Sequence, residues 1–449
     1  MTDLLNLRSL RTLSVADDGH DYVVKAECLD VPQQCPDPQC VGMSLYGHGS
    51  EPQSIMDTPA HGRRTKIEIE RKRYRCQGCR KTFFEPIPDI DAKRQATARL
   101  VAYVEQRCLK QTFLSLGRDV GLDEKTIRNI FDDYIKRLEA TIKFEVPEFL
   151  GIDELKVVKQ YRAVITNIGE NSLYDILPTR RQDALMKYFS QLPDRGRVQW
   201  VAMDMWKPYR NVVTRCLPQA QIVVDKFHIQ RMANEALEKV RKQIRKEVST
   251  RQRLKLKDDR FLLLRRLHDL NQQEYEIVKG WIEDFPRLGA AYVLKEGFFS
   301  IWDAWSRAKA EQLYAAWLAI IQADLLADFR PLLQAMHNWN TQIFNYFDQR
   351  ITNAYTESIN NLIKGMNRMG RGYSFDVLKA RLLYNEEARK AATVRTSARK
   401  RSVLPDMDNY VMFTRDITSI AGALSDEKII EYGPSLQVLT RLLAEGYFN

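Results

Sequence analysis

The spacing of apolar residues changes along the chain and predicts first strands and then helices. Polar and apolar side chains alternate over residues 63–74, which is typical of a strand with one buried face. Residues 1–88 as a whole are predicted to form short strands and turns. Between residues 95 and 140 the apolar residues recur at helical spacing, first at Ala98, Val101, Val104 and Cys108 and then at Leu114, Leu116 and Val120. We therefore expect a small β-domain followed by a group of helices.

A turn and a capped helix come next. Gly121 and Leu122 are expected to form the turn, and Asp123 is a suitable N-cap for a helix over 124–134. A helix, a glycine-containing turn and a second, capped helix are the layout of a helix-turn-helix. In that layout, four side chains of the last helix would face base edges and phosphates of a nucleic acid: Lys125, Thr126, Arg128 and Asn129. The alternative is a plain three-helix bundle that contacts no nucleic acid.

The pattern after Val146 is that of an α/β domain. Three consecutive strands are predicted over 149–154, 161–168 and 172–177. Helices and strands then alternate, with helices over 182–192 and 209–216 and strands over 198–203 and 221–224. This order is how an RNase H-like sheet is threaded, although many α/β domains share parts of it.

The segment 229–345 is predicted to be almost entirely helical, with lysine and arginine concentrated early and tryptophan late. We interpret it as an all-helical insertion into the RNase H-like domain, which then resumes in two helices over 353–367 and 375–393. One more helix is expected over 435–443, in a tail to which we assign no chemistry. The predicted architecture is multidomain, α+β and α/β, with segments 1–88, 89–146, 147–228, 229–345, 346–400 and 401–449.

Composition and charge narrow the possible functions. The chain has 449 residues, of which 44% are hydrophobic and 28% charged, the balance of a soluble globular protein with several domains. Its net charge of +11 favours a polyanionic partner, above all nucleic acid. A basic soluble protein without such a partner is the alternative. Because no signal-peptide core and no run of about 18 apolar residues occurs, we expect no membrane span and a cytoplasmic protein with reduced thiols.

Four of the seven cysteines form two pairs near the front of the chain. Cys35 and Cys40 are separated by four residues, and Cys76 and Cys79 by two. Reduced cysteine pairs on turns that are joined by strands suit a zinc ion held by four thiolates. Four unligated cysteines in a small β-domain are the alternative. The remaining cysteines lack paired spacing and are expected to be core residues: Cys28, Cys108 and Cys216.

Two aspartates lie where the pattern predicts buried strands. Asp153 belongs to the first strand of the α/β domain, and Asp204 comes directly after the strand over 198–203. A buried carboxylate is costly unless a metal ion or another partner compensates it. Glu357 lies at the start of a helix. Together the three carboxylates would supply the oxygen ligands that Mg²⁺ or Mn²⁺ prefers, and two such ions roughly 3.5–4 Å apart can assist phosphodiester transfer.

Each of these carboxylates also has an ordinary interpretation, as a salt-bridge or capping group. No Gly-rich P-loop, nucleophile elbow or HExxH motif offers a competing chemistry. The segment 225–228 has two interpretations as well. In the first, Asp225 caps the next helix and His228 packs beside the sheet. In the second, His228 donates a hydrogen bond near a scissile phosphate or supports a carboxylate ligand.

These motifs together resemble those of bacterial insertion-sequence transposases of the ISL3 family over nearly the whole chain. The matching segments are GIDE at 151–154, MDMW with PY within 203–209, residues 218–228 ending in VDKFH, NEAL with VR within 234–241, residues 352–364 around Glu357, and the cysteine pairs with RCQGCRKTF at 75–83. Several motifs in the same order make the resemblance specific.

The resemblance implies a DDE transposase whose zinc ribbon and helix-turn-helix bind the terminal inverted repeats of its own element. It implies that Asp153, Asp204 and Glu357 are the catalytic triad, with the helical insertion between the second and third members. The segment 225–228 is similar to an Asp/Cys-x-x-His element of related transposases. Target DNA is the second implied partner, and a homodimer is the simplest way to bring two element ends together.

Basic side chains are expected to contact DNA in two further places. Arg71 and Arg73 lie in the basic strand of the cysteine-containing domain, and Lys242, Arg245 and Lys246 lie in the predicted insertion, where phosphate contact is expected. Two other functions stay open from sequence. One is a catalytically inactive DNA-binding regulator derived from a transposase, and the other is a structure-selective nuclease with the same fold.

Overall fold

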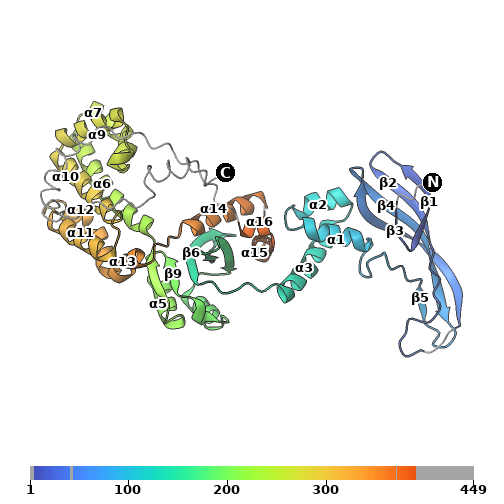
Figure 1. The fold of residues 1–449 in the computed structure, drawn as a ribbon. Helices are drawn as coiled ribbons and strands as arrows, with labels where there is room; N and C mark the ends of the chain where they lie inside the picture. Colours follow the sequence, from blue (N-terminus) through green and yellow to red (C-terminus); the bar gives the residue numbers. More distant parts are fainter. Residues whose placement is uncertain (1–4, 41–43, 371, 391–449) are drawn as a thin grey trace, which may run out of the picture. The chain divides into compact units, whose positions relative to one another are not determined.

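The structure is a computed structural model that describes residues 5–40, 44–370 and 372–390, and these fall into two compact units (Figure 1). The first unit contains the described residues up to Asp225 and those from Ile351 onward, and the second contains Lys226–Arg350. The chain thus leaves the first unit after Asp225 and re-enters it at Ile351. The helix predicted over 435–443 lies outside the described residues.

A five-stranded sheet opens the first unit. Its order is β1-β2-β4-β3 with β5 beside β4, and its strands are β1 (Leu10–Asp17), β2 (Asp21–Cys28), β3 (Leu45–Ala60), β4 (Arg63–Cys76) and β5 (Thr82–Phe84). The strand predicted over 63–74 is confirmed as β4, whereas the general prediction of short strands was wrong for the hairpin of β3 and β4, whose strands have 16 and 14 residues. His61 and Gly62, both with positive φ, close this hairpin, and Ile55 and Ile67 bury one of its faces.

Three helices follow, α1 (Ala98–Arg107), α2 (Phe113–Val120) and α3 (Glu124–Thr141). The predicted turn is confirmed, because Gly121 ends α2 with a φ of 77°, which a residue with a side chain rarely adopts. The predicted N-cap is confirmed as well, since Asp123 accepts a hydrogen bond from the backbone N–H of Thr126 at 2.9 Å. The helix over 124–134 was predicted too short. It continues to Thr141 because Ile135 extends its buried face.

The second sheet has the order β10-β9-β6-β7-β8. Its strands are β6 (Phe149–Val157), β7 (Gln160–Asn167), β8 (Ser172–Leu177), β9 (Trp200–Met203) and β10 (Gln221–Val224). β6, β7 and β8 are antiparallel neighbours, whereas β9 and β10 run parallel to β6. The helices between the strands are α4 (Gln182–Ser190) and α5 (Lys207–Cys216). All the strands predicted for this domain are present, and β6 runs past its predicted end because it forms a hairpin with β7.

The returning chain adds α14 (Ala354–Met369), α15 (Phe375–Tyr384) and α16 (Glu386–Arg389) to the first unit. α14 packs on β6 and β7, and α15 packs on β8. The prediction of one helix over 375–393 was wrong at its end, because the extended backbone of Asn385 terminates α15. Figure 1 shows α14, α15 and α16 gathered beside β6.

Helix α15 belongs to two hydrophobic cores. Val377 and Ala380 are buried with residues of α1, α2 and α3. Leu378 and Leu382, on another side of the helix, are buried with residues of β6, β7 and β8. α15 therefore joins the core of the three-helix group to the core of the second sheet.

The second unit consists of helices packed around buried aromatic side chains. They are α6 (Lys226–Glu247), α7 (Thr250–Asp258), α8 (Arg260–Leu264), α9 (Gln272–Asp284), α10 (Pro286–Ile301), α11 (Arg307–Ala319), α12 (Leu326–Asn338) and α13 (Asn340–Asp348). The segment 229–345 was predicted to be helical, which the structure bears out. None of the helices among the described residues combines the length and the apolar character that crossing a membrane requires.

Candidate functional site

Two aspartates lie side by side on neighbouring strands of the second sheet. β6 and β9 are parallel and pair in register up to Ile152 opposite Met203. Asp153, within β6, and Asp204, directly after β9, each come one residue later. Paired residues of adjacent strands face the same side of a sheet. If the backbone kept this register for one more residue, both carboxylates would face one side of the sheet at the end of β9.

Asp225 directly follows β10, the strand on the other side of β9 from β6. β10 pairs with β9 up to Val224 opposite Met203, and the backbone N–H of Asp225 donates to the carbonyl of Met203 at 3.1 Å. Asp225 is fully buried, whereas Asp204 is half-buried. One ligand atom each of Asp204, Asp225 and His228 lie within 4.8 Å of one another. His228 is three residues from Asp225 along the chain, so the first turn of α6 sets its position.

Asp153 is buried, at 8% exposure, and its carboxylate has two hydrogen-bond donors. The side-chain amide of Asn360 donates to Oδ2 at 2.6 Å, and the backbone N–H of Glu154 donates to Oδ1 at 2.7 Å. Sequence reasoning did not give Asn360 a role. The available signal was helical spacing, because Asn353, the N-cap of α14, precedes Asn360 by seven residues. The side-chain amide of Asn353 donates to the carbonyl of Ile152 at 3.4 Å.

Glycine at position 151 allows α14 to approach β6 closely. A Cβ atom there would lie 2.3 Å from Oγ1 of Thr166 and 2.6 Å from Oγ1 of Thr356. These two hydroxyls hydrogen bond to each other at 2.7 Å, which links α14 to β7. The GIDE segment therefore supplies the carboxylate of Asp153, and its glycine leaves room for α14, whose Asn360 hydrogen bonds to that carboxylate.

Glu357 lies in the first turn of α14 and is exposed. It precedes Asn360 by three residues, so the two side chains occupy neighbouring positions on one side of the helix. Among the described residues, the two groups of potential ligands within 4.8 Å of one another include neither Glu357 nor Asp153. The structure thus places Asp153 and Asp204 one residue beyond the same strand pair, and it places Glu357 on the helix that contacts Asp153.

An aromatic and cationic frame surrounds the end of β9. Tyr209 is buried in α5 and donates its hydroxyl to the backbone carbonyl of Asp153 at 3.3 Å. Burial, and then the carboxylate of Asp153, raise the pKa of Tyr209, which keeps that hydroxyl protonated. Trp206 packs edge-on against Tyr209 with ring centroids 4.5 Å apart, and the guanidinium of Arg180 lies over the Trp206 ring at 4.9 Å. Sequence reasoning missed this frame.

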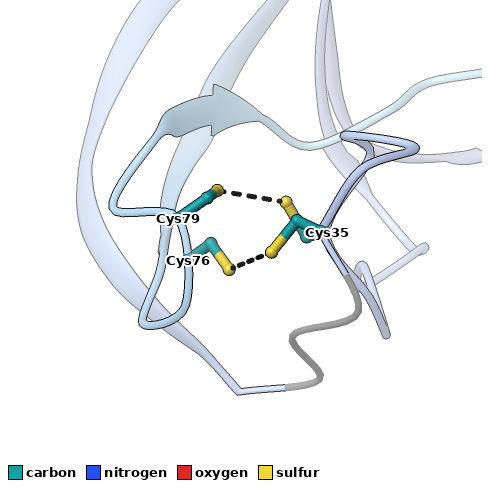
Figure 2. Close-up of side chains that lie close together, drawn as sticks. Cys35, Cys76 and Cys79 are labelled. Carbon is teal, nitrogen blue, oxygen red and sulfur yellow. Dashed lines mark hydrogen bonds between the residues drawn. The ribbon is translucent and has the colours of Figure 1, made fainter.

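The four paired cysteines converge, as predicted. Their sulfur atoms lie within 4.8 Å of one another, with 3.7 Å between Cys35 and Cys79 and 3.6 Å between Cys40 and Cys76. Figure 2 shows Cys76 and Cys79 pointing toward Cys35. A tetrahedral zinc ion with bonds of about 2.3 Å to sulfur requires sulfur atoms about 3.8 Å apart. The backbone N–H of Cys79 lowers the pKa of the Cys76 thiol to about 7, whereas burial and hydrogen bonds with the other three sulfur atoms raise the pKa of the Cys35 thiol. The sulfur atoms thus share protons that a zinc ion would displace.

The predicted recognition residues lie at the start of α3. Lys125, Arg128 and Asn129 are exposed, whereas Thr126 donates its hydroxyl to Asp123 at 2.6 Å and so completes the N-cap. Arg128 pairs with Glu124 at 3.2 Å, and its guanidinium lies over a ring of α2. Three of the four side chains are thus available on the surface, and Arg128 is held in place by its neighbours.

The other basic candidates differ in how far they are engaged within the protein. Arg71 donates to the carbonyl of Glu85 at 2.9 Å, and Arg73 pairs with Glu51 at 3.1 Å. On α6, Lys242 lies 3.7 Å from Glu238, Arg245 donates to the carbonyl of Arg253, and Lys246 is exposed. Of these side chains, Arg71 is the most enclosed by intramolecular contacts.

Three segments of the chain match known protein families. Residues 150–382 match a family described as transposase, residues 85–135 match the helix-turn-helix domain of transposase family ISL3, and residues 32–79 match the zinc-finger of transposase IS204/IS1001/IS1096/IS1165. The chain is also 25% identical over 367 residues to the transposase for insertion sequence element IS1001 of Bordetella parapertussis, covering 78% of this chain and 89% of that protein. The chain belongs to the ISL3 family of transposases.

Proposed function

We propose that this transposase binds the terminal inverted repeats of its insertion sequence and catalyses metal-dependent cleavage and transfer of DNA strands. Asp153, Asp204 and Glu357 are the proposed triad. The observation that carries the proposal is the position of Asp153 within β6 and of Asp204 directly after the parallel strand β9, one residue beyond the pair Ile152–Met203, next to a helix that brings Glu357. The sheet order β10-β9-β6-β7-β8 supports an RNase H-like fold, with Lys226–Arg350 as a helical insertion between the second and third carboxylates.

The donor set fits Mg²⁺ or Mn²⁺. The proposed ligands are all carboxylate oxygens, which these hard cations prefer. Asp153, Asp204 and Glu357 would hold such ions, which would supply activation of the attacking oxygen and stabilisation of the leaving oxygen of the phosphodiester. The protein's own contribution is to hold the carboxylates in place, and the amide of Asn360 orients Asp153 for this purpose.

Asp225 and His228 support this site in our proposal. Asp204 shares a cluster of potential ligands with both residues, so a hydrogen bond from His228 or a charge on Asp225 acts directly on Asp204. Imidazoles near metal-bound carboxylates commonly fix the orientation of a ligand. We therefore assign His228 a positioning role beside Asp204, and it is not one of the three proposed metal ligands.

The front of the chain supplies DNA recognition in this proposal. One zinc ion held by Cys35, Cys40, Cys76 and Cys79 stabilises the first sheet, whose long hairpin carries Arg73. Arg128 and Asn129 of α3 read base edges in the element ends. Lys242, Arg245 and Lys246 contact phosphates without regard to sequence. A homodimer holds the two element ends, and target DNA receives the cleaved 3′ ends.

Strand transfer distinguishes this function from its alternatives. The full chain would be incubated with Mg²⁺, a labelled DNA that contains the inverted repeats flanking its reading frame, and a supercoiled target plasmid. We expect cleavage at the repeat ends and covalent joining of their 3′ hydroxyls to the plasmid. Cleavage of branched DNA without joining would favour a structure-selective nuclease. Specific binding without any cleavage would favour a regulator that has lost catalysis.

A further inference from the structure

Trp305 is exposed to an unusual degree. It is 78% exposed, more than any other large hydrophobic residue that the structure describes. The other tryptophans of the same helical unit are buried, namely Trp281, Trp302, Trp317 and Trp339. Loose packing of the unit therefore does not account for the exposure of Trp305. A tryptophan placed in solvent leaves a large flat apolar surface for a partner.

The loop that carries Trp305, between α10 and α11, is held on its N-terminal side. Trp302 stacks on Phe347 with ring centroids 5.7 Å apart and an interplanar angle of 19°. The carboxylate of Asp303 receives two hydrogen bonds from Arg266, at 3.0 and 2.7 Å. These contacts fix the backbone that leads to Trp305.

The residues directly before and after Trp305 are held as well. Ala304, which precedes Trp305, is buried, and its carbonyl accepts a hydrogen bond from Arg350. Ser306 caps α11 by accepting from the backbone N–H of Lys309 at 3.2 Å. Trp305 is thus presented by a backbone that is fixed on both sides, so little conformational entropy is lost when its ring is covered.

A positive charge accompanies the exposed ring. Arg350 is exposed, and its described contacts are the Ala304 carbonyl and the ring of Tyr346 at 5.9 Å, neither of which carries a formal charge. The nearby carboxylate of Asp303 is neutralised by Arg266. The surface around Trp305 therefore combines a flat apolar ring with a cation, which suits a flat ligand that also carries a negative charge.

We propose that Trp305 stacks on an unpaired base of the DNA substrate while Arg350 contacts a phosphate beside that base. The inference rests on the proposed function only in taking DNA as the substrate. A base inside a duplex has both faces covered by its neighbours, so only an unpaired or extruded base can cover the ring. Stacking of a base on an aromatic side chain changes affinity by about 5- to 150-fold. The site recognises an unpaired nucleotide without selecting its sequence.

The test uses 2-aminopurine, whose fluorescence falls when it stacks. Two duplexes are prepared, one with a single unpaired 2-aminopurine and one with the same base paired to thymine. The full chain should quench the unpaired probe and bind that duplex more tightly than the paired one. We expect Trp305→Ala to abolish the quenching and to weaken binding of the unpaired probe about tenfold. Affinity for the paired duplex should stay within about twofold, and Trp305→Phe should keep most of the effect.

Two further variants sharpen the test. Phe261→Ala removes another exposed aromatic ring of the same unit and should behave as wild type. Arg350→Gln keeps a donor for the Ala304 carbonyl but removes the charge, so it should flatten the salt dependence of binding by about one unit of slope.

Unchanged quenching in Trp305→Ala, or an equal loss of affinity for both duplexes, overturns the proposal. So does conversion of a dimer to monomers by Trp305→Ala in sedimentation, because the ring would then be a contact between copies.

A catalytically disabled background separates this inference from the proposed function. Quenching of the unpaired probe requires no strand cleavage, so it should persist in Asp204→Asn. Quenching without any cleavage activity in the wild-type chain would count against the proposed function alone. Cleavage and strand transfer without quenching would count against the stacking role of Trp305 alone.

Discussion

The side-chain amide of Asn360 donates a 2.6 Å hydrogen bond to Oδ2 of Asp153, and thereby connects α14 to the first strand of the second sheet. The two residues are 207 positions apart in the sequence, and the whole helical unit lies between them. This bond fixes the orientation of one carboxylate and the position of the helix that carries Glu357. Three of the predictions below depend on this part of the fold.

Removal of the Asn360 amide should weaken metal binding more than it weakens DNA binding. Partners that orient a metal ligand are typically worth about 10- to 100-fold in metal affinity or activity. We expect Asn360→Ala to shift the Mg²⁺ concentration for half-maximal cleavage upward by at least about tenfold. Asn361→Ala alters the adjacent exposed asparagine of α14 and serves as the matched control. Superimposable Mg²⁺ curves for the two variants would refute the orienting role of Asn360.

A methyl group at position 151 should displace α14 from β6. In Gly151→Ala the added Cβ would overlap the hydroxyls of Thr166 and Thr356, and such overpacking costs about 1–3 kcal/mol. We expect a lower urea midpoint and reduced cleavage. Gly365→Ala, in the same helix, meets no atom within 4 Å and should leave stability equal or raise it by up to about 1 kcal/mol. Equal stability of the two variants would show that α14 does not pack as closely as described.

The cysteine cluster should hold one zinc ion per chain. Cys76→Ser should lose the zinc and unfold the segments that carry the four cysteines, because the buried core of the sheet around Ile55 and Ile67 does not include them. Metal analysis and limited proteolysis would measure both effects. Cys28→Ser changes a cysteine of β2 outside the cluster and should retain zinc. Wild-type protein without zinc after mild purification would contradict this prediction.

We expect α3 to determine the preference for the element ends and α6 to determine the general affinity for DNA. Arg128→Ala should lower the preference for element ends over random DNA, because a good bidentate base contact is worth roughly 1–3 kcal/mol of discrimination. Neutralisation of Lys242, Arg245 and Lys246 together should weaken binding to both DNAs about equally and flatten the salt dependence. Competition binding at several salt concentrations measures both. If the α6 variant lost the preference for element ends while Arg128→Ala kept it, α3 would be part of a structural bundle that does not recognise DNA sequence.

Local sequence patterns predicted the elements that depend on local signals. The cap at Asp123, the turn at Gly121 and the strands of the second sheet follow from capping residues, glycine and apolar periodicity, which act over a few positions. The alternating pattern of β4 was recognised, but β3 was missed because many of its residues are polar and are held by the partner strand β4. The end of α15 was missed because Asn385 is not a strong helix-breaking residue.

The candidate site was only partly predictable for a similar reason. Asp153 and Asp204 were found because charged residues beside apolar strands are conspicuous, and the cysteines were found by their spacing. Asn360, Arg180 and Tyr209 act through contacts with residues far away in the sequence. Tyr209 and Asn360 lie in segments that carry the family resemblance, but no local pattern shows which atoms these side chains contact. Trp305 was noted only as one tryptophan among several, because its exposure depends on packing.

Strand cleavage by carboxylate variants tests the central claim most directly. Asp153→Asn, Asp204→Asn and Glu357→Gln are nearly isosteric, so each should fold and bind element ends as the wild type does. Loss of one metal ligand should reduce Mg²⁺-dependent cleavage of end-containing DNA by at least about 100-fold. Asp183→Asn, at an exposed carboxylate of α4, should cleave normally. Near-normal cleavage by Asp204→Asn, with wild-type binding, would contradict the proposed site.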